Sequence, residues 1–301
     1  MTARPFRGVL PAITTPFLAD GTVDHALLGK HAKWQLDAGC QGIIALGSLG
    51  EGATLSFEEK VACLETLVAA AAPKPVFAGI AALSTRDAVA LAKAAERVGC
   101  KGLMVLPAYV HIGELREARA HVEAVIRATA LPCMLYNNPP AYRTDFSPAF
   151  IAELAAVNAN LVAVKESSGD ARRVTAIQAL VGDRLDLLVG MDDMAVEGAA
   201  MGAVGWVAGL VNAFPAESVA LFRIARERGA SAAMPLYRWF LPLLRLDTVP
   251  EFVQLIKLVQ QEVGQGNERV RGPRLPVAGA MRENALNILR TALATRPKDL
   301  A

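Results

Sequence analysis

The chain of 301 residues has few cysteines, a formal net charge of only +2 and no long apolar run. The four cysteines stand alone, without a CxxC pair or a neighbouring pair of histidines: Cys40, Cys63, Cys100 and Cys133. This spacing argues against a zinc site and against a disulfide scaffold, so we expect buried, reduced thiols. Lys and Arg total 31 against 29 for Asp and Glu, with no long block of either sign. Neither nucleic acid nor an anionic membrane is therefore expected as a partner.

An apolar segment for export or for membrane insertion is also missing. Residues 1–10 contain two arginines and a proline but no apolar core of a signal peptide. No window approaches the stretch of about eighteen uncharged apolar residues that a membrane span needs. We therefore expect a soluble, cytoplasmic protein. Hydrophobic residues make up 53% of the chain, which is enough for a large core, and the expected ligand is a small molecule.

Short apolar runs rich in Val, Ile and Leu recur along the first two thirds of the chain, and Ala-rich stretches of helical period separate them. The runs are residues 8–13, 42–46, 76–80, 102–106, 133–136, 161–164, 187–189 and 205–208. Strands that alternate with helices predict a parallel sheet, and runs without polar alternation predict a sheet covered on both faces. A (β/α)8 barrel fits this pattern better than an open doubly wound sheet, in which a GxGxxG after the first strand is usual.

The organisation changes after residue 208, where only helical patterns remain. We predict that residues 1–229 form the barrel and that residues 230–301 form helices packed on it, without a linker that would make them an independent domain. Helix starts carry the expected signals. Ser56 with Glu59 reads as a capping box, and Ser147 with Pro148 reads as an N-cap followed by proline at the first helical position.

Reactive groups of such a barrel project from the carboxyl ends of its strands. The sixth run is followed by Lys165 and the fifth ends in Tyr136. An inward-pointing Lys165 among apolar walls would have a lowered pKa and could attack a ketone as a neutral amine. The alternative is a surface lysine at a strand end. Tyr136 would move protons beside it, provided that Ser48 and Tyr109 relay them, because a phenol is a poor base in water.

The loop of residues 47–52 after the second run contains Ser48 between glycines. Successive backbone N–H groups and one hydroxyl could hold a carboxylate there, although a tight strand-to-helix turn would look similar. The GK[ST] of a P-loop is missing, so a phosphate ligand is not expected.

Other polar residues favour structural roles. The four histidines share no metal-binding spacing, and no metal site is predicted from them: His25, His31, His111 and His121. Asp192 and Asp193 follow the seventh run and are explained by a helix N-terminus. Arg172 and Arg173 read as a solvated helix face.

The motifs GSLGE from Gly47, YNNP from Tyr136 and KES from Lys165, at these intervals, resemble the dihydrodipicolinate synthase and N-acetylneuraminate lyase family of class I aldolases. The resemblance covers nearly the whole chain. It implies a (β/α)8 barrel with extra C-terminal helices, Schiff-base chemistry on 2-keto acids without a metal or cofactor, and a homotetramer built as a dimer of dimers.

The resemblance also implies roles for individual residues. Lys165 matches the imine-forming lysine, Tyr136 the general acid/base, and Ser48 the hydroxyl residue that holds the carboxylate, with the backbone of Leu49 beside it. Tyr109 matches a relay tyrosine that in many members reaches across a subunit interface. Two further residues are expected to line the substrate pocket: Gly190, through its carbonyl, and Asn138.

Two departures from the family pattern bear on the substrate. The residue after Ser48 is usually threonine, whose hydroxyl binds the carboxylate, and here it is Leu49. In dihydrodipicolinate synthases an arginine binds the second substrate's carboxylate at the place of Ala141. Loss of a charge-assisted contact worth roughly 1.5 to 3 kcal/mol argues against dihydrodipicolinate synthesis. Arg143, two positions on, is the candidate substitute.

The motifs, together with GWVAGLVNAFP and LDTVPEFVQLIKL, resemble the branch of Δ1-pyrroline-4-hydroxy-2-carboxylate deaminases of hydroxyproline breakdown. That branch implies attack of Lys165 on C2 of the cyclic imine, movement of a C3 proton by Tyr136, and loss of water and ammonia to give 2-oxoglutarate semialdehyde. Alternatives are a 2-keto-3-deoxy sugar-acid aldolase or dehydratase, a dihydrodipicolinate synthase-like pyruvate aldolase, and a non-catalytic keto-acid binding protein.

Overall fold

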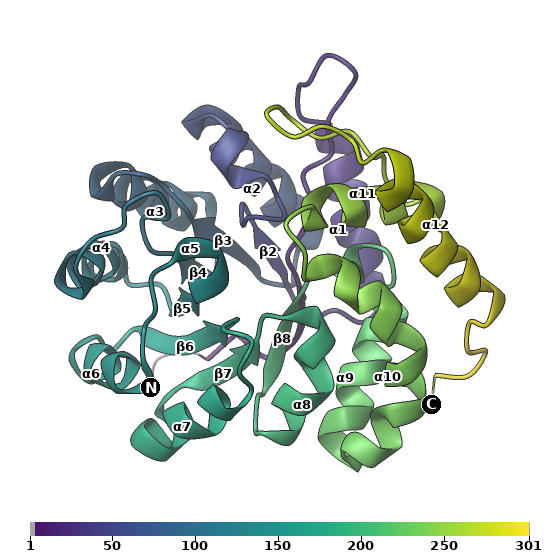
Figure 1. Cartoon of the computed structure of the whole chain (residues 1–301). Helices are drawn as coiled ribbons and strands as arrows, with labels where there is room; N and C mark the ends of the chain where they lie inside the picture. The colour runs from purple at the N-terminus through teal and green to yellow at the C-terminus, as the bar shows by residue number, and fades with distance from the viewer. Residues whose placement is uncertain (1–3, 301) are drawn as a thin grey trace.

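The computed structural model describes residues 4–300 and contains eight parallel strands in one sheet that curls into a barrel (Figure 1). The strands are β1 (Gly8–Pro11), β2 (Ile43–Ala45), β3 (Val76–Ile80), β4 (Gly102–Val105), β5 (Cys133–Asn137), β6 (Leu161–Glu166), β7 (Asp186–Val189) and β8 (Gly205–Ala208). From β2 to β8 each strand pairs with the next along the chain, and β8 pairs with β1. A parallel bridge between Ala12 and Ile44 joins the β1 and β2 sides, so the predicted (β/α)8 barrel is confirmed.

Helices follow the strands and form the outer layer of the barrel (Figure 1). They are α1 (His25–Asp37), α2 (Phe57–Ala71), α3 (Thr85–Val98), α4 (Leu115–Arg127), α5 (Pro139–Tyr142), α6 (Pro148–Val157), α7 (Arg172–Val181), α8 (Ala195–Ala200), α9 (Pro215–Arg228), α10 (Ala230–Leu244), α11 (Phe252–Glu262) and α12 (Gly279–Ala294). Short 3₁₀ turns lie between them: η1 (Gly52–Thr54), η2 (Gly182–Arg184), η3 (Asp192–Met194), η4 (Leu210–Asn212) and η5 (Arg245–Asp247).

Helices α10, α11 and α12 lie on the side of the barrel that α1, α8 and α9 occupy (Figure 1). The turn between α10 and α11 reaches the mouth of the barrel, where Asp247, Thr248 and Val249 line a cavity together with strand-end residues. The division of the chain at residue 229 into a barrel and dependent helices remains a prediction about folding units.

Both helix N-caps predicted from the sequence are present in the structure. Ser56 accepts the N–H of Glu59 while Glu59 accepts the N–H of Ser56, which is the predicted capping box of α2, and Ser147 caps α6 ahead of Pro148. Strand β6 is two residues longer than predicted. Lys165 pairs with Leu188 of β7, so it lies within the strand and not after it.

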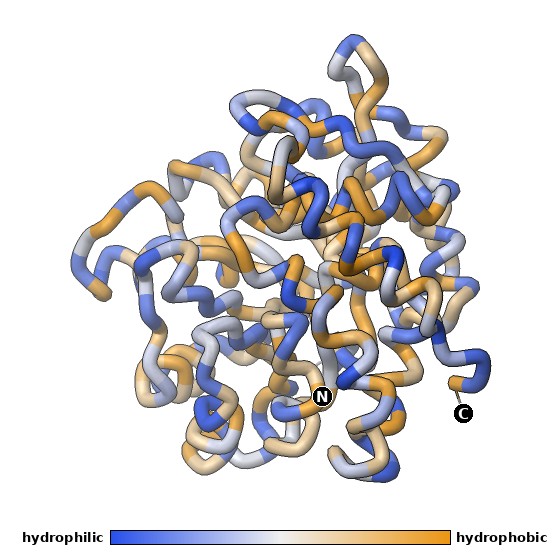
Figure 2. The backbone as a smooth tube through the Cα atoms, turned by 45° about the vertical axis from the view of Figure 1, so that its right-hand side comes forward, coloured by the Kyte–Doolittle hydropathy of each residue, from blue (hydrophilic) through white to orange (hydrophobic). Residues whose placement is uncertain are grey.

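The core consists of two groups of buried side chains, one between the sheet and the helices and one inside the barrel. Along the helices, polar and apolar residues are mixed within each turn, as an apolar face towards the core and a polar face towards solvent require (Figure 2). All four cysteines are buried and free, as predicted.

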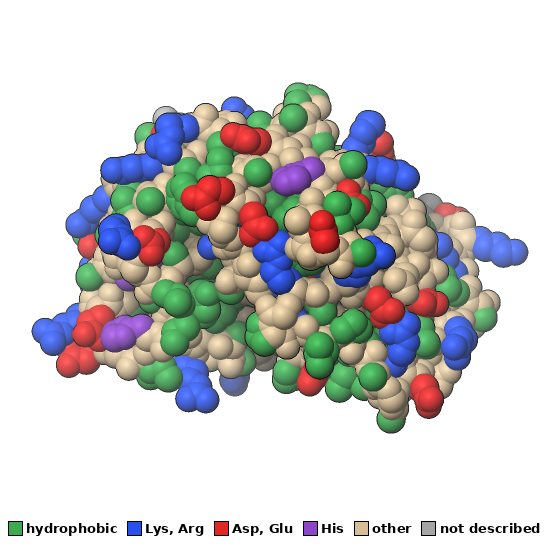
Figure 3. Space-filling model, turned by 90° about the horizontal axis from the view of Figure 1, so that it is seen from above, with side chains coloured by type: hydrophobic (Ala, Val, Ile, Leu, Met, Phe, Trp, Pro, Cys, Tyr) green, Lys and Arg blue, Asp and Glu red, His purple; other side chains and the backbone are tan. Residues whose placement is uncertain are grey.

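The surface carries both charge signs, and acidic and basic side chains are interspersed over the face drawn in Figure 3. Within residues 4–300, no helix combines the length and the apolar character needed to span a bilayer.

Candidate active site

A cavity of about 450 Å³ opens where the strands end at the mouth of the barrel. Its walls come from the loops after β1, β2, β7 and β8, from β5 and β6, and from the chain around η5 and α11. Residues that matter for its chemistry are Ser48, Leu49, Tyr136, Asn138, Ala141, Tyr142, Lys165, Gly190 and Asp247. The predicted residues after the second, fifth, sixth and seventh strands therefore meet in one pocket.

Lys165 enters this pocket from the inner face of β6. Its side chain is buried, and its register partner on β5 is Tyr136, so its Nζ atom lies 3.9 Å from the centroid of the Tyr136 ring. Among residues 4–300, this amine has no hydrogen-bond or ion-pair partner. Burial lowers the pKa of Lys165, and nearby groups, among them the carboxylates of Asp247 and Asp192, only partly oppose that shift.

Gly190, after β7, leaves the space that Lys165 occupies. A Cβ atom at this position would lie 2.5 Å from Lys165 Cε and 1.9 Å from Ser167 Oγ. Any other residue would displace the lysine, so the glycine is required by close approach of the backbone to that side chain.

Tyr136 is fixed by its neighbours. The Asn138 amide donates a hydrogen bond to the Tyr136 hydroxyl at 2.9 Å, and the Asn138 side chain also caps α5 by accepting the N–H of Ala141. Burial raises the pKa of Tyr136, while the hydrogen bond that Asn138 donates to its hydroxyl acts in the opposite direction. Asn138 lines the pocket as predicted and also orients the phenol.

Tyr142 is a residue of this site that the sequence interpretation missed. Its hydroxyl forms a hydrogen bond with the Ser48 hydroxyl, and its ring meets the Tyr136 ring edge-on with centroids 5.5 Å apart. The available signal was Asn138-Pro139-Pro140, a cap followed by prolines, which predicts the one-turn helix α5 that brings Tyr142 back to the pocket.

Tyr109 does not occupy the predicted relay position within a single chain. Its ring centroid lies 6.3 Å from that of Tyr142, and it is not among the residues that line the cavity around Lys165. The Ser48 hydroxyl bonds to Tyr142 instead. A role of Tyr109 across a subunit interface remains a prediction.

The glycine loop after β2 is fixed by hydrogen bonds between Glu51 and residues of the C-terminal segment. Glu51 has φ of 52°, in the left-handed region, and its buried carboxylate accepts hydrogen bonds from Lys257 Nζ at 2.7 Å and from the Arg271 N–H at 3.0 Å. Within residues 4–300, the N–H groups of Ser48 and Leu49 have no backbone partner. The loop therefore offers two amides and one hydroxyl at the edge of the cavity.

Arg143 does not replace the missing arginine. Its side chain is exposed, and it lies in a separate depression beside residues 107–118, whereas Ala141 lines the cavity around Lys165. The backbone of Arg143 ends α5 in the left-handed region, with φ of 58°.

Asp192 lies at a helix start after β7, as predicted, in the first turn of η3 ahead of α8, but its side chain bonds elsewhere. Its carboxylate accepts hydrogen bonds from the Trp206 indole at 3.0 Å and from the backbone N–H groups of Gly209 and Leu210. Burial raises the pKa of Asp192 to about 6. It therefore ties the loop after β7 to the loop after β8.

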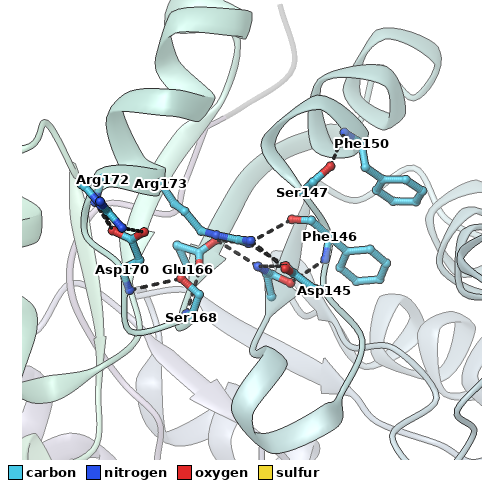
Figure 4. Close-up of polar contacts among 10 residues, drawn as sticks. Asp145, Phe146, Ser147, Phe150, Glu166, Ser168, Asp170, Arg172 and Arg173 are labelled. Atoms are coloured by element: carbon cyan, nitrogen blue, oxygen red, sulfur yellow. Dashed lines mark hydrogen bonds and ion pairs between the residues drawn. The ribbon is translucent and has the colours of Figure 1, made fainter.

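Arg172 and Arg173 differ from each other. Arg172 is exposed, as predicted, and pairs with Asp170. Arg173 is only partly exposed, because its guanidinium binds Asp145 through two contacts of 2.6 and 2.7 Å and packs 4.0 Å from the buried Glu166 (Figure 4). Glu166 in turn accepts hydrogen bonds from Asn137 and from the Ser168 N–H. This network fixes the residues that directly follow Tyr136 and Lys165.

The histidines lie apart from the pocket around Lys165. His31 is buried and its hydrogen-bonding partners are Asn212 and Gln260, and burial lowers its pKa to about 4. Among residues 4–300, no group of three His, Cys, Asp or Glu residues could hold a metal ion.

Comparisons with known proteins show which family this sequence matches. Residues 5–292 match the dihydrodipicolinate synthetase family. The chain is 31% identical over 284 residues to a 4-hydroxy-tetrahydrodipicolinate synthase of Agrobacterium fabrum, covering 94% of this chain and 96% of that protein. It is 32% identical over 280 residues to one of a Chelativorans species, covering 92% and 95%.

Solved structures of similar proteins have the same fold. The 4-hydroxy-tetrahydrodipicolinate synthase of Methylacidiphilum fumariolicum superposes with a TM-score of 0.92 at 27% identity, over 96% of each chain. The dihydrodipicolinate synthase of Acinetobacter baumannii, solved with pyruvate, gives a TM-score of 0.91 at 29% identity, over 95% of this chain and 99% of that one.

Proposed function

The chain belongs to the dihydrodipicolinate synthetase family, and from this premise we propose that it is a lyase that forms a Schiff base between Lys165 and a small 2-oxo acid or cyclic imino acid. The observation that carries the proposal is the buried amine of Lys165, which faces a cavity beside the Tyr136 phenol. A lysine whose pKa is lowered by burial has a larger neutral fraction at neutral pH, and the neutral amine is the nucleophile.

The expected reaction begins when the amine adds to C2, after which water leaves a 2-oxo acid, or the ring nitrogen leaves C2 of a cyclic imine as a protonated amine. The resulting imine with Lys165 acidifies the protons on C3. Tyr136 is the group beside Lys165 that would move such a proton. Its raised pKa makes it a weak acid by itself, and the adjacent Tyr142, whose hydroxyl is hydrogen-bonded to Ser48, would give the proton a path across the pocket.

The substrate carboxylate is expected at the loop after β2. The free N–H groups of Ser48 and Leu49, with the Ser48 hydroxyl, suit an anion at the edge of the cavity. Leu49 contributes no side-chain donor, so we expect weaker polar recognition than a threonine at this position would give.

A pyruvate-dependent aldol reaction is the first candidate for the specific activity. Its support is the similarity to proteins named 4-hydroxy-tetrahydrodipicolinate synthase and to a synthase solved with pyruvate. In this reaction the enamine of pyruvate would add to an aldehyde, or the reverse cleavage would release pyruvate from a 4-hydroxy-2-oxo acid.

The Δ1-pyrroline-4-hydroxy-2-carboxylate deaminase is the second candidate, because the pocket has no cation for a second carboxylate at Ala141 and Arg143 lies outside it. One water would leave at C4 and two would enter, at C2 and C5, so that 2-oxoglutarate semialdehyde and ammonia form. A place in hydroxyproline catabolism rests on this candidate alone. A 2-keto-3-deoxy sugar-acid aldolase or dehydratase would use the same imine.

Trapping with borohydride tests the proposal. With pyruvate, we expect a covalent adduct on Lys165, located by peptide mass spectrometry, and its loss in Lys165→Ala. Lys33→Ala, which removes an exposed lysine, is the matched control and should keep the adduct. An adduct elsewhere, or none with any 2-oxo acid, overturns the proposal and leaves a binding protein as the alternative.

We also propose that the chain acts as a homotetramer, a dimer of dimers, in the cytoplasm. Several large apolar side chains near Tyr109 are exposed in a single chain and would be covered by a second copy: Leu83, Val110, Ile112 and Leu115. Light scattering at micromolar concentration should give four times the mass of one chain.

A further inference from the structure

Asp247 contributes a carboxyl group to the pocket, although it does not belong to a barrel strand or to a loop that directly follows one. It ends the 3₁₀ turn η5 between α10 and α11, and it lines the same cavity as Lys165. Neighbours on its side of the cavity are mostly apolar or uncharged: Thr248, Val249, Pro250 and Phe252. The C-terminal helices therefore deliver one acidic side chain to the reaction cavity.

Gly209 makes room for this carboxyl. A Cβ atom on Gly209 would lie 2.0 Å from Asp247 Oδ1, so the carboxyl rests on the backbone directly after β8. In the sheet, β5 adjoins β6 on one side, and β7 and then β8 follow on the other. Along the sheet, Tyr136 of β5 and the Gly209 backbone on which Asp247 rests therefore lie on opposite sides of β6 and Lys165.

The surroundings of Asp247 favour a protonated carboxyl. Among residues 4–300 its side chain has no hydrogen-bond or ion-pair partner, whereas Asp192 has three donors. The charged groups that face it are Asp192 and Asp193 of η3 and Lys165 of β6, and the Arg245 guanidinium lies 3.8 Å from Asp193. Burial, with the two aspartates, raises the pKa of Asp247 well above its ordinary value, against the opposing effect of Lys165.

We propose that Asp247 is a second acid of this site, which exchanges a proton with the oxygen on C4 of the substrate. The substrate class is then a small 4-hydroxy-2-oxo acid or its cyclic imine. This inference rests on the Schiff-base function proposed above. There Tyr136 transfers the C3 proton, and no group is assigned to protonate the oxygen on C4.

The chemistry requires such a group in either candidate reaction. In aldol addition the enamine carbon C3 bonds to the aldehyde carbon, which becomes C4, and the carbonyl π pair moves to oxygen, which takes the proton of Asp247. In elimination the enamine pair forms C3=C4, the C4–O bond breaks, and the oxygen keeps that pair, takes the proton and leaves as water. No external oxidant or reductant is involved, and the carboxylate regains its proton from solvent.

Asp247→Asn tests the role through two assays on the same protein. The first follows deuterium exchange into the methyl group of pyruvate in D₂O by NMR, which needs the imine and the C3 proton transfer but nothing at C4. The second follows turnover of Δ1-pyrroline-4-hydroxy-2-carboxylate, by ammonia release, and of 2-keto-3-deoxygluconate, by cleavage or dehydration. Asp193→Asn is the matched control, since Asp193 is an acid on the same rim that does not line the cavity.

We expect Asp247→Asn to keep exchange within about threefold and to lose roughly 10² to 10⁴ in kcat on the C4-oxygenated probe that the wild type turns over. Asp193→Asn should keep both rates. Wild-type kcat should fall as pH rises through the pKa of Asp247, because the acid form is needed, and this dependence should be absent in Asp247→Asn.

The other outcomes are distinguishable. Unchanged turnover in Asp247→Asn overturns the inference, and so does an equal loss of exchange, which would place Asp247 in support of Lys165. Wild-type exchange without turnover of either probe overturns the substrate class. Absence of exchange in the wild type instead contradicts the Schiff-base function itself.

Discussion

Two buried lysines in this molecule have almost the same surroundings and different partners. Lys165 lies 3.9 Å from the centroid of the Tyr136 ring, and Lys257 of α11 lies 4.4 Å from that of Phe17. Burial lowers the pKa of both. Lys257, however, donates to the Glu51 carboxylate at 2.7 Å and to the Thr15 carbonyl at 2.8 Å, whereas Lys165 has neither kind of partner among residues 4–300.

Burial alone therefore does not make a lysine reactive. A carboxylate at hydrogen-bond distance keeps an ammonium charged, and a charged ammonium is no nucleophile. Lys257 uses its charge to join α11 to the loop that presents Ser48. The amine of Lys165 faces a cavity without a hydrogen-bond or ion-pair partner. Its burial lowers the stability of the fold, and functional sites tolerate such a loss.

Tyr136→Phe is the sharpest test of this contrast, because it gives Lys165 an aromatic neighbour without a hydroxyl, as Lys257 has in Phe17. We expect turnover of a 2-oxo acid substrate to fall by roughly 10² to 10⁴, the range for a positioned acid/base. Steady-state kinetics measure it. Borohydride should still trap the Lys165 adduct in this variant, which shows that the amine is intact. An unchanged kcat would mean that another group moves the C3 proton.

Lys165 could be predicted from the sequence because the signal is local. Eight apolar runs with helices between them predict the barrel, and a lysine after one run with a tyrosine at the end of the previous run predicts the pair at the strand ends. The structure brings these residues together with Ser48, Asn138 and Gly190.

The residues that escaped prediction are placed by tertiary packing. Asp247 lies in a helical segment with no strand-end signal. In the sequence, Lys257 is one polar residue in an otherwise largely apolar helical segment. Its partner Glu51 is 206 residues away, so only the fold shows the ion pair. Arg173 was misread because Asp145, its partner, comes from another loop. Local periodicity contains no information about such long-range pairs.

Lys257→Met tests the opposite side of the comparison. It leaves the buried Glu51 with only the Arg271 N–H and, at 3.8 Å, Arg274. Breaking a buried ion pair from one side typically costs about 3 to 5 kcal/mol of unfolding free energy, and urea denaturation measures it. Lys33→Met, which removes an exposed pair with Asp37, is the control and should cost less than about 1 kcal/mol. An equal loss of unfolding free energy in the two variants would show that the Lys257–Glu51 ion pair does not stabilise the packing of α11.

The smallest expected effect has the opposite sign. Lys165→Met, the same substitution at the unpaired lysine, should abolish imine trapping and raise the free energy of unfolding at pH 7 by about 1 kcal/mol. The folded-state pKa of Lys165 is lowered from 10.5, so the unfolded chain binds its proton more tightly. The destabilisation by Lys165 is therefore complete below the folded-state pKa and disappears as pH rises towards 10.5.

The gain from Lys165→Met should follow this pH dependence. Urea denaturation of the variant and the wild type at pH 7 and near pH 10 should show a difference that shrinks at the higher pH, because the wild-type lysine is then neutral in both states. A loss of stability at pH 7, of the kind expected for Lys257→Met, would mean that Lys165 has a charged partner in the folded protein. The two lysines would then be equivalent, and burial beside Tyr136 would not explain a nucleophilic amine.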